Sequence, residues 1–322
     1  MFAILPRYFA LVALSLTLRQ APAGAQDLPR GIPEKEGVPA AAISDFINGA
    51  NHSRTEFHSF MLLRHGKVIA EGWWKPYGPR LKHTLYSVSK TFTMTAVGLA
   101  IKEKKLKLTD KVVSFFPKDQ PATISPNLAA LTVRDALIMA DGQDPEPSAV
   151  STDTNWARAF LAVPVVNPPG TKFLYNSMGT YMLSAIVQKV TGQKVLDYLK
   201  PRLFDPLGII DEDWETSPQG VNTGGWGLRL STEDMAKFGQ LLLQKGKWNG
   251  RQLIPREWVE EATTVKIMQN PNASQAARDS SDWLQGYCYQ MWRCRHNGVR
   301  ADGALGQFII LLPDQDAVIA MT

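Results

Sequence analysis

Hydrophobic and polar residues follow two different periods in the early part of this chain. Apolar residues recur at helical spacing over 39–48, which predicts a helix lying against a sheet. Two runs typical of strands follow, 57–64 and 67–74, and the His-Gly pair between them predicts a hairpin. A loop then leads into the apolar segment 94–101, which we expect to form a buried helix. This pattern is typical of one half of an α/β layer.

From about residue 105 the pattern changes to short helical segments. Helices are expected over 106–116, 131–139 and 156–163, separated by turns that contain Pro and Asn. A further helix is expected over 181–190, after a Pro-Pro-Gly turn. No pairs of strands are evident in this part of the chain. These features predict a helical insert.

The last part of the chain returns to strands. Ser231 and Asp234 stand three residues apart, close to the pattern of a capping box, and predict the start of a helix. Three antiparallel strands are then expected, over 287–293, 307–312 and 317–321. They would complete the sheet that the early hairpin begins.

The predicted fold is therefore of α/β plus α class: an antiparallel β-sheet flanked by helices, with an inserted all-helical domain. The sheet domain would consist of residues 26–104 and 224–322, and the helical domain of residues 105–223. We expect a cleft where the two domains meet.

The first 25 residues are typical of a cleavable signal peptide. Arg7 precedes the apolar stretch 8–18, and the small residues 23–25 predict cleavage near Ala25. We expect an exported protein, periplasmic if the host has two membranes and otherwise secreted. An uncleaved anchor is the alternative. Because the apolar stretch is too short to span a bilayer comfortably and no later segment is long enough, no stable membrane insertion is expected.

Composition excludes several classes of function. The formal net charge of +5 is mild, and removal of the leader lowers it to +3. The basic residues are scattered rather than clustered with aromatic residues, which argues against a nucleic-acid partner. The five histidines lack the spacing of zinc ligands, and neither a phosphate-binding loop nor a Gly-x-Ser-x-Gly elbow is present. We therefore expect nucleophilic chemistry without a cofactor or metal.

Two cysteines, Cys288 and Cys294, are compatible with export. If both lie on one extended strand, about 20 Å separates them, which is too far for a disulfide. We expect two free or packed thiols, and a bridge that closes a hairpin is the alternative.

The candidate nucleophile is Ser87, with Lys90 three residues later at the start of the predicted buried helix. Residues three apart share a helix face, so the Lys90 amine would lie beside the Ser87 hydroxyl. A lysine whose pKa is lowered by burial can accept a serine proton, and the helix N-terminus favours negative charge there. The alternative is an ordinary serine cap followed by a solvated lysine, because Ser-x-x-Lys is a short pattern.

Two further segments could each line a cleft or a substrate site. Tyr175 follows a proline-stiffened turn and precedes a helix, so its ring could point into a cleft, or it could be a buried ring with a satisfied hydroxyl. The stretch 300–307 contains small residues that would let a substrate backbone approach closely. The alternative is a glycine-rich strand entry without a role.

The chain thus has a Ser-x-x-Lys pattern at a helix start, then a Tyr-x-Ser loop in a helical insert, then a Gly-containing strand motif near its end. Motifs of this kind in this order resemble the serine β-lactamase and penicillin-binding-protein superfamily. Within it, the chain is similar to the branch of class C β-lactamases, D-Ala-D-Ala carboxypeptidases, certain esterases and 6-aminohexanoate-dimer hydrolases. The resemblance spans roughly residues 31–322. Sequence context matches around five stretches: 86–92, 169–173, 189–192, 203–208 and 234–239. It implies a β-lactamase/transpeptidase-like fold and a small-molecule or peptide substrate, and leaves the oligomeric state open.

The resemblance also implies roles for individual residues. Ser87 would attack a carbonyl, Lys90 would share its proton, and Tyr175 would act as partner base and later protonate the leaving group. Ser177 occupies the third position of a Tyr-x-Asn element, where class C β-lactamases have Asn. No glutamate in a separate loop is required as a deacylating base, and none is evident.

The family's Lys-Thr-Gly or His-x-Gly strand motif falls on Asp302-Gly303-Ala304. The oxyanion hole would combine the Ser87 amide with one amide from a strand near 304–306. An acid in place of a base would repel a substrate carboxylate, which disfavours penicillin-like and D-Ala-D-Ala substrates. Esters, neutral amides and substrates with a cationic group remain as candidate substrates.

We therefore expect an exported serine hydrolase that acts through an acyl-enzyme on an ester or small amide. The alternatives are a β-lactamase or D-Ala-D-Ala carboxypeptidase, and a non-catalytic relative that binds cell-wall peptides or another protein. Relatives usually continue past the final strand into a helix that covers the sheet, whereas this chain ends on an apolar strand at Thr322. We expect that this helix is missing and that stability is reduced if nothing else covers that face.

Overall fold

The structure, a computed structural model, describes residues 27–147 and 153–322, so the predicted leader lies outside the described residues. The α-helices are α1 (Ala40–His52), α2 (Ser89–Lys102), α3 (Pro126–Ala130), α4 (Val133–Leu137), α5 (Trp156–Ala162), α6 (Ser177–Thr191), α7 (Val195–Leu199), α8 (Asp205–Leu207), α9 (Thr232–Leu243), α10 (Arg256–Ala262) and α11 (Gln275–Ser280). The strands are β1 (Ser59–Arg64), β2 (Lys67–Trp73), β3 (His83–Thr84), β4 (Asp213–Trp214), β5 (Leu228–Leu230), β6 (Lys247–Trp248), β7 (Arg251–Gln252), β8 (Trp292–Arg293), β9 (Val299–Gly303), β10 (Gln307–Leu312) and β11 (Ala317–Met321).

The main sheet has the strand order β2-β1-β11-β10-β9-β8. Its neighbouring strands are antiparallel, and β1 pairs with β11 in a register that places Leu63 opposite Val318. Residues alternate between buried and partly exposed along β10, as a strand with one face on the core requires. The predicted hairpin and the strands at 307–312 and 317–321 are thus confirmed.

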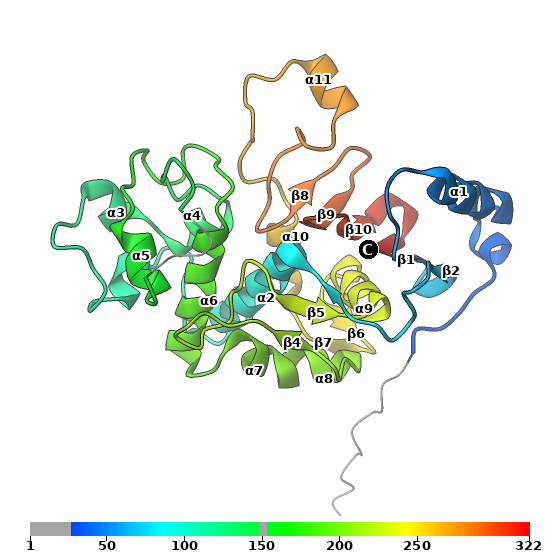
Figure 1. Ribbon diagram of the computed structural model, residues 1–322, viewed down its shortest axis with the longest axis horizontal. Helices are drawn as coiled ribbons and strands as arrows, with labels where there is room; N and C mark the ends of the chain where they lie inside the picture. The colour runs from blue at the N-terminus through cyan, green and yellow to red at the C-terminus, as the bar shows by residue number, and fades with distance from the viewer. Residues whose placement is uncertain (1–26, 148–152) are drawn as a thin grey trace, which may run out of the picture.

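Helices cover the two faces of this sheet differently. Phe46 of α1 contacts Phe60 of β1, with ring centroids 4.5 Å apart. The next residue along β1, Met61, points to the opposite face and is fully buried in the main core. On that face, a Cβ at Gly239 of α9 would lie 2.6 Å from the Val318 side chain, so α9 packs closely on the sheet. Figure 1 shows α1 and α9 on the two sides of β1.

A largely helical part lies beside the sheet part and contains α3, α4, α5 and α6 (Figure 1, green). The helix α2 runs between the two parts, and each of its residues from Ser89 to Ala100 is buried. This confirms the predicted buried helix. It also makes α2 the rigid element on which a nucleophile at its start would depend.

Three details of the predicted elements were wrong. The region 106–116 contains only a short 3₁₀ turn, Val112–Phe115, because Lys111 before it is extended and forms an antiparallel bridge with Thr132. The expected strand 287–293 is broken at Gln290, whose φ is +56°, so that only β8 is a strand and Tyr287 forms isolated bridges. Strand β9 was not predicted, because Arg300 and Asp302 interrupt its apolar pattern. Residues 304–306, where a strand amide was expected, form a turn.

Further differences bear on the site. A small sheet of order β3-β5-β4 pairs β4, from the region expected to be helical, with β5. Helix α6 begins at Ser177, earlier than the predicted 181. Both cysteines are free, as expected. Among residues 27–147 and 153–322, no helix is long and apolar enough to cross a membrane.

Candidate active site

Ser87 lies in a single 3₁₀ turn, Tyr86–Val88, that leads directly into α2. The residue before it, Tyr86, has a φ of +45°, a conformation that is costly for a tyrosine and is held by the surrounding structure. The Leu85 amide donates to the Leu228 carbonyl of β5 at 2.9 Å. The strand β9 approaches from the other side, where a Cβ at Gly303 would lie 2.3 Å from the Leu85 carbonyl. Glycine at 303 therefore allows this strand to reach the Ser87 turn.

Lys90 lies one turn after Ser87, and its side chain is directed into the protein with 1% exposure. Its Nζ donates to Ser87 Oγ at 3.1 Å, to Ser177 Oγ at 3.1 Å and to the Gly225 carbonyl at 2.8 Å. Burial lowers the pKa of Lys90 to about 7, against a smaller opposing effect of Glu146. Near neutral pH a large share of Lys90 is therefore unprotonated and able to accept a proton.

Ser177 is the first residue of α6, which is why its hydroxyl faces Lys90. Asn176 caps this helix by accepting a hydrogen bond from the Gly179 amide at 2.9 Å. The Asn176 amide group in turn donates to Gln143 at 3.0 Å, and both side chains are buried. The cap thus fixes the position of the Ser177 hydroxyl.

Tyr175 places its ring beside Lys90, with 4.9 Å between Lys90 Nζ and the ring centroid. Burial raises the pKa of the Tyr175 phenol, and a hydrogen bond with Ser87 opposes that effect. The ring stacks on Trp292, with centroids 5.7 Å apart and an interplanar angle of 17°. The preceding residue is anchored by a Leu174 amide to Met139 carbonyl bond of 2.8 Å. Tyr175 therefore stays protonated at neutral pH and is held against the Ser87 and Lys90 pair.

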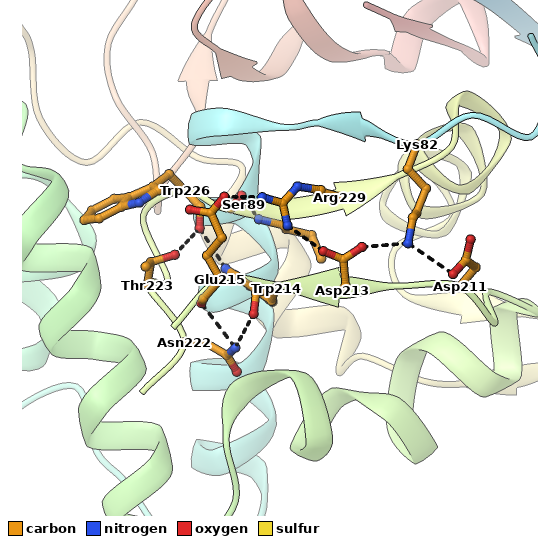
Figure 2. Close-up of polar contacts among 11 residues, drawn as sticks. Lys82, Ser89, Asp211, Asp213, Trp214, Glu215, Asn222, Thr223, Trp226 and Arg229 are labelled. Carbon is orange, nitrogen blue, oxygen red and sulfur yellow. Dashed lines mark hydrogen bonds and ion pairs between the residues drawn. The ribbon is translucent and has the colours of Figure 1, made fainter. Parts of the chain in front are cut away.

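The Gly225 carbonyl completes the set of oxygen atoms around Lys90. A Cβ at Gly225 would lie 2.8 Å from the Ser177 carbonyl, so only glycine fits between α6 and Lys90 without a shift. The neighbouring strand is held by Ser89 Oγ, which accepts from the Leu228 amide at 3.1 Å. Figure 2 shows how this strand is fastened further by a network of ion pairs and hydrogen bonds among Lys82, Asp211, Asp213, Glu215 and Arg229.

The predicted motif on β9 shows an arrangement that the sequence did not suggest. Asp302 accepts a hydrogen bond from Arg300 Nε at 2.7 Å, and the two side chains are 11% and 7% exposed. Burial raises the pKa of Asp302 and the arginine opposes that effect. Burial also acts to lower the pKa of Arg300, but the combined effects of Asp302 and Cys294 outweigh it and the pKa is raised. The sequence had indicated a single negative charge at Asp302. In the structure Asp302 is instead one half of an ion pair with Arg300.

The structure brings four of the candidate residues together directly: Ser87, Lys90, Ser177 and Tyr175. Asp302 acts on this group electrostatically, because its charge raises the pKa of Tyr175. Gly303 supports the turn beneath Ser87, and Ala304 lies exposed in the turn after β9.

Sequence patterns did not point to three participants. The Gly225 carbonyl is a backbone group and carries no signal of residue type. Glu146 accepts a hydrogen bond from the Ser177 amide at 2.6 Å and raises the pKa of both Lys90 and Tyr175. Its proline-flanked loop had suggested only a turn. Arg300 could have been found, because residues two apart on a strand share a face.

The geometry is suited to nucleophilic attack on a carbonyl. A serine hydroxyl lies within hydrogen-bonding distance of a buried lysine of lowered pKa, and a protonated phenol lies beside both. Within the described residues, no group of three or more His, Cys, Asp or Glu side chains is arranged to hold a metal ion.

Comparisons with known proteins agree with this geometry. A family model described as Beta-lactamase matches residues 40–322. The 6-aminohexanoate-dimer hydrolase of Paenarthrobacter ureafaciens is 26% identical over 281 residues, which cover 81% of this chain and 71% of that protein.

Two solved structures have the same β-lactamase/transpeptidase-like fold. EstCE1, a hydrolase with promiscuous acyltransferase activity, superposes with a TM-score of 0.72 at 17% identity, covering 88% of this chain and 92% of its own. A penicillin-binding-protein homologue from Caulobacter crescentus superposes with a TM-score of 0.71 at 17% identity, covering 92% of this chain and 93% of its own.

Proposed function

The chain belongs to the beta-lactamase family, and we propose that it hydrolyses an ester or small amide through an acyl-enzyme at Ser87. The observation that carries the proposal is the position of Lys90. Its amine is buried, contacts Ser87 Oγ at 3.1 Å, and has a pKa of about 7. A lysine in this state can activate a serine without a metal or a histidine.

In the acylation step, Ser87 Oγ bonds to the substrate carbonyl carbon as its proton passes to Lys90. The bond from that carbon to the leaving oxygen or nitrogen then breaks, and the leaving atom takes a proton from the Tyr175 phenol. Lys90 returns its proton to Tyr175, which resets the phenol. Water repeats the sequence in the second half, forming the acid and freeing Ser87. Tyr175 suits this relay because it is protonated at the outset.

The charge pattern supports an uncharged substrate. Asp302 and Arg300 neutralise each other in the position where family members carry a cationic motif residue. An acid-base pair offers a substrate carboxylate much less attraction than a free lysine would. The relatives are consistent with ester or amide chemistry, since one is named as a 6-aminohexanoate-dimer hydrolase and another as a hydrolase with acyltransferase activity.

Labelling with a fluorophosphonate tests the nucleophile. We expect mass spectrometry to find one adduct, on Ser87, in folded protein. Ser87→Ala should take up no label, whereas Ser89→Ala, which alters a neighbouring serine of the same segment, should still be labelled. Folded protein without a Ser87 adduct would contradict the enzyme assignment and favour a non-catalytic binding protein.

Parallel assays then identify the substrate class. We expect a short-chain nitrophenyl ester to be hydrolysed with a higher kcat/KM than a cephalosporin or a D-Ala-D-Ala peptide. Fastest turnover of the cephalosporin would show that the Asp302 and Arg300 pair does not exclude carboxylate-bearing substrates.

We also propose export, on the basis of the leader pattern in residues 1–25. Expression of the full chain in a host with two membranes should yield a periplasmic protein whose N-terminus is Gln26. Retention of the leader on protein found in the cytoplasm would contradict export.

A further inference from the structure

A ladder of aromatic rings leads from the reactive residues to the molecular surface. Tyr175 stacks on Trp292 at 5.7 Å, and Trp292 meets Trp283 edge to face at 4.8 Å. Tyr287 packs against the edge of Trp292 at 4.9 Å from the buried side. Trp292 is partly exposed and Trp283 is 51% exposed. Trp283 is thus more exposed than most tryptophans, which are highly buried on average.

The Trp283 ring contacts a cation, Arg300, on one of its faces. The Arg300 guanidinium lies 4.4 Å from the Trp283 ring centroid and 5.8 Å from that of Trp292. Arg300 is itself fixed by Asp302 and by a 3.1 Å bond from Nη1 to the Asp282 carbonyl. One face of Trp283 is therefore covered by a fixed positive charge, and the exposed part of the ring remains available to a ligand.

The backbone around these rings keeps them in place. Trp292 and Arg300 are direct partners in the pairing of β8 with β9. The Arg293 amide donates to the Gly286 carbonyl at 2.9 Å, which ties β8 to the chain that carries Trp283. Figure 1 shows that the segment between α10 and β8, which includes α11, projects beyond β8 and β9. Because the rings are fixed before a ligand arrives, little side-chain entropy is lost on binding.

We propose that Trp283 and Trp292 form a platform that seats a planar aromatic group on the leaving side of the substrate. The proposal rests on the proposed function, in which Tyr175 delivers a proton to the leaving atom. A group bonded to that atom lies next to Tyr175, and Trp292 is the ring stacked on Tyr175. The platform would therefore select among leaving groups and not among acyl groups.

The charge behind Trp283 indicates which groups the platform accepts. A guanidinium on one face of an indole draws electron density toward itself, which weakens the attraction of the other face for a cation. An uncharged aromatic ring instead gains from stacking, which contributes beyond the area that it buries. We therefore expect aromatic alcohols or amines as leaving groups, in preference to aliphatic or cationic ones of similar size.

The test compares benzyl acetate with cyclohexylmethyl acetate, which share an acyl group and differ in the planarity of the leaving group. The wild-type protein should prefer the benzyl ester. Trp283→Ala should lower kcat/KM for the benzyl ester about 3- to 10-fold and leave the cyclohexylmethyl ester nearly unchanged. Trp283→Phe should retain most of the preference, because it retains a ring.

Trp248→Ala, which truncates a partly exposed tryptophan on β6, is the matched control and should not change the preference. Equal losses for both esters in Trp283→Ala, or no loss for either, would overturn the platform. A loss that follows the acyl group, in phenylacetyl against cyclohexylacetyl esters of one alcohol, would also overturn it. Fluorophosphonate labelling of Ser87 in Trp283→Ala separates the two proposals, because labelled protein without a leaving-group preference contradicts only the platform.

Discussion

Two buried basic side chains, Lys90 beside Tyr175 and Arg300 near Trp292, which stacks on Tyr175, have opposite electrostatic environments. Lys90 is surrounded by two hydroxyls and one carbonyl, and burial lowers its pKa to about 7. Arg300 is bonded to the Asp302 carboxylate, and its pKa is raised despite burial. Neutral oxygen atoms can accept hydrogen bonds from a cation without stabilising its charge as strongly as a carboxylate does.

This difference separates a group that can exchange a proton from one that holds its charge. Lys90 can lose its proton near neutral pH, which is what activation of Ser87 requires. Arg300 retains its charge and contributes to the arrangement of Asp302, Trp283 and Trp292. The reactive end of the site thus depends on a lysine whose hydrogen-bond partners are neutral oxygens, and the substrate-facing end depends on an arginine bonded to a carboxylate.

Substitution of Lys90 gives the largest expected effect. Lys90→Met removes the proton acceptor, and Lys90→Arg replaces it with a cation that cannot give up its proton. Both should lower the rate of acylation by about 10³-fold or more. The matched control is Lys237→Met, because Lys237 is also buried but lies 3.9 Å from the Asp234 carboxylate on α9. Comparable activity in Lys90→Arg and the wild type would remove Lys90 from the mechanism.

Tyr175→Phe should have the second largest effect. It removes the hydroxyl and keeps the ring that stacks on Trp292, so the aromatic ladder should survive. We expect kcat/KM to fall about 10²-fold, most strongly for esters of poorly acidic alcohols, which need a proton on leaving. Tyr181→Phe, which removes a buried hydroxyl bonded to Ser217, is the control and should change activity little. A wild-type rate in Tyr175→Phe would exclude the phenol from proton transfer.

The pH dependence of fluorophosphonate inactivation tests the Lys90 environment directly. Lys90 must be neutral to accept the proton, so the rate should rise about tenfold per pH unit at acidic pH and level off above about pH 7. Glu146 raises the pKa of Lys90, so Glu146→Gln should move this midpoint to lower pH. A midpoint near that of an exposed lysine, or a shift to higher pH in Glu146→Gln, would contradict the arrangement.

The sequence was most informative where structure is local. The pair of Ser87 and Lys90 could be predicted because one helical turn places them together, and α2 was visible as an apolar run. Ser177 and Tyr175 lie far away in sequence, and only the resemblance to a known family connected them with Ser87. The Gly225 carbonyl could not be predicted, since a backbone oxygen has no residue-type signal.

Strands β8 and β9 were harder to predict, because neither shows the regular apolar pattern of a strand. Gln290 adopts a left-handed conformation that ends the expected strand and leaves only two residues in β8. Asp302 alone suggested a repulsive negative charge. Its neutralisation by Arg300 depends on two side chains that share one face of β9, which the spacing allowed but did not require.

Asp302→Asn would remove the carboxylate from Arg300 and so make the two cations more alike. The amide oxygen can still accept from Arg300 Nε, so we expect a moderate loss of about 1–3 kcal/mol in the free energy of unfolding, measured by chemical denaturation. Arg300 would then present an uncompensated positive charge near Trp292, the ring that stacks on Tyr175.

The ratio of kcat/KM for a D-Ala-D-Ala peptide to that for a neutral ester should rise about fivefold, which corresponds to about 1 kcal/mol of additional charge attraction. Arg300 would remain charged, because loss of one acceptor does not bring a guanidinium near its ionisation range. The control is Asp314→Asn, which removes a carboxylate from the η5 turn (Pro313–Gln315) after β10. An unchanged ratio in folded Asp302→Asn would show that the ion pair supports β9 without influencing which charges the site accepts.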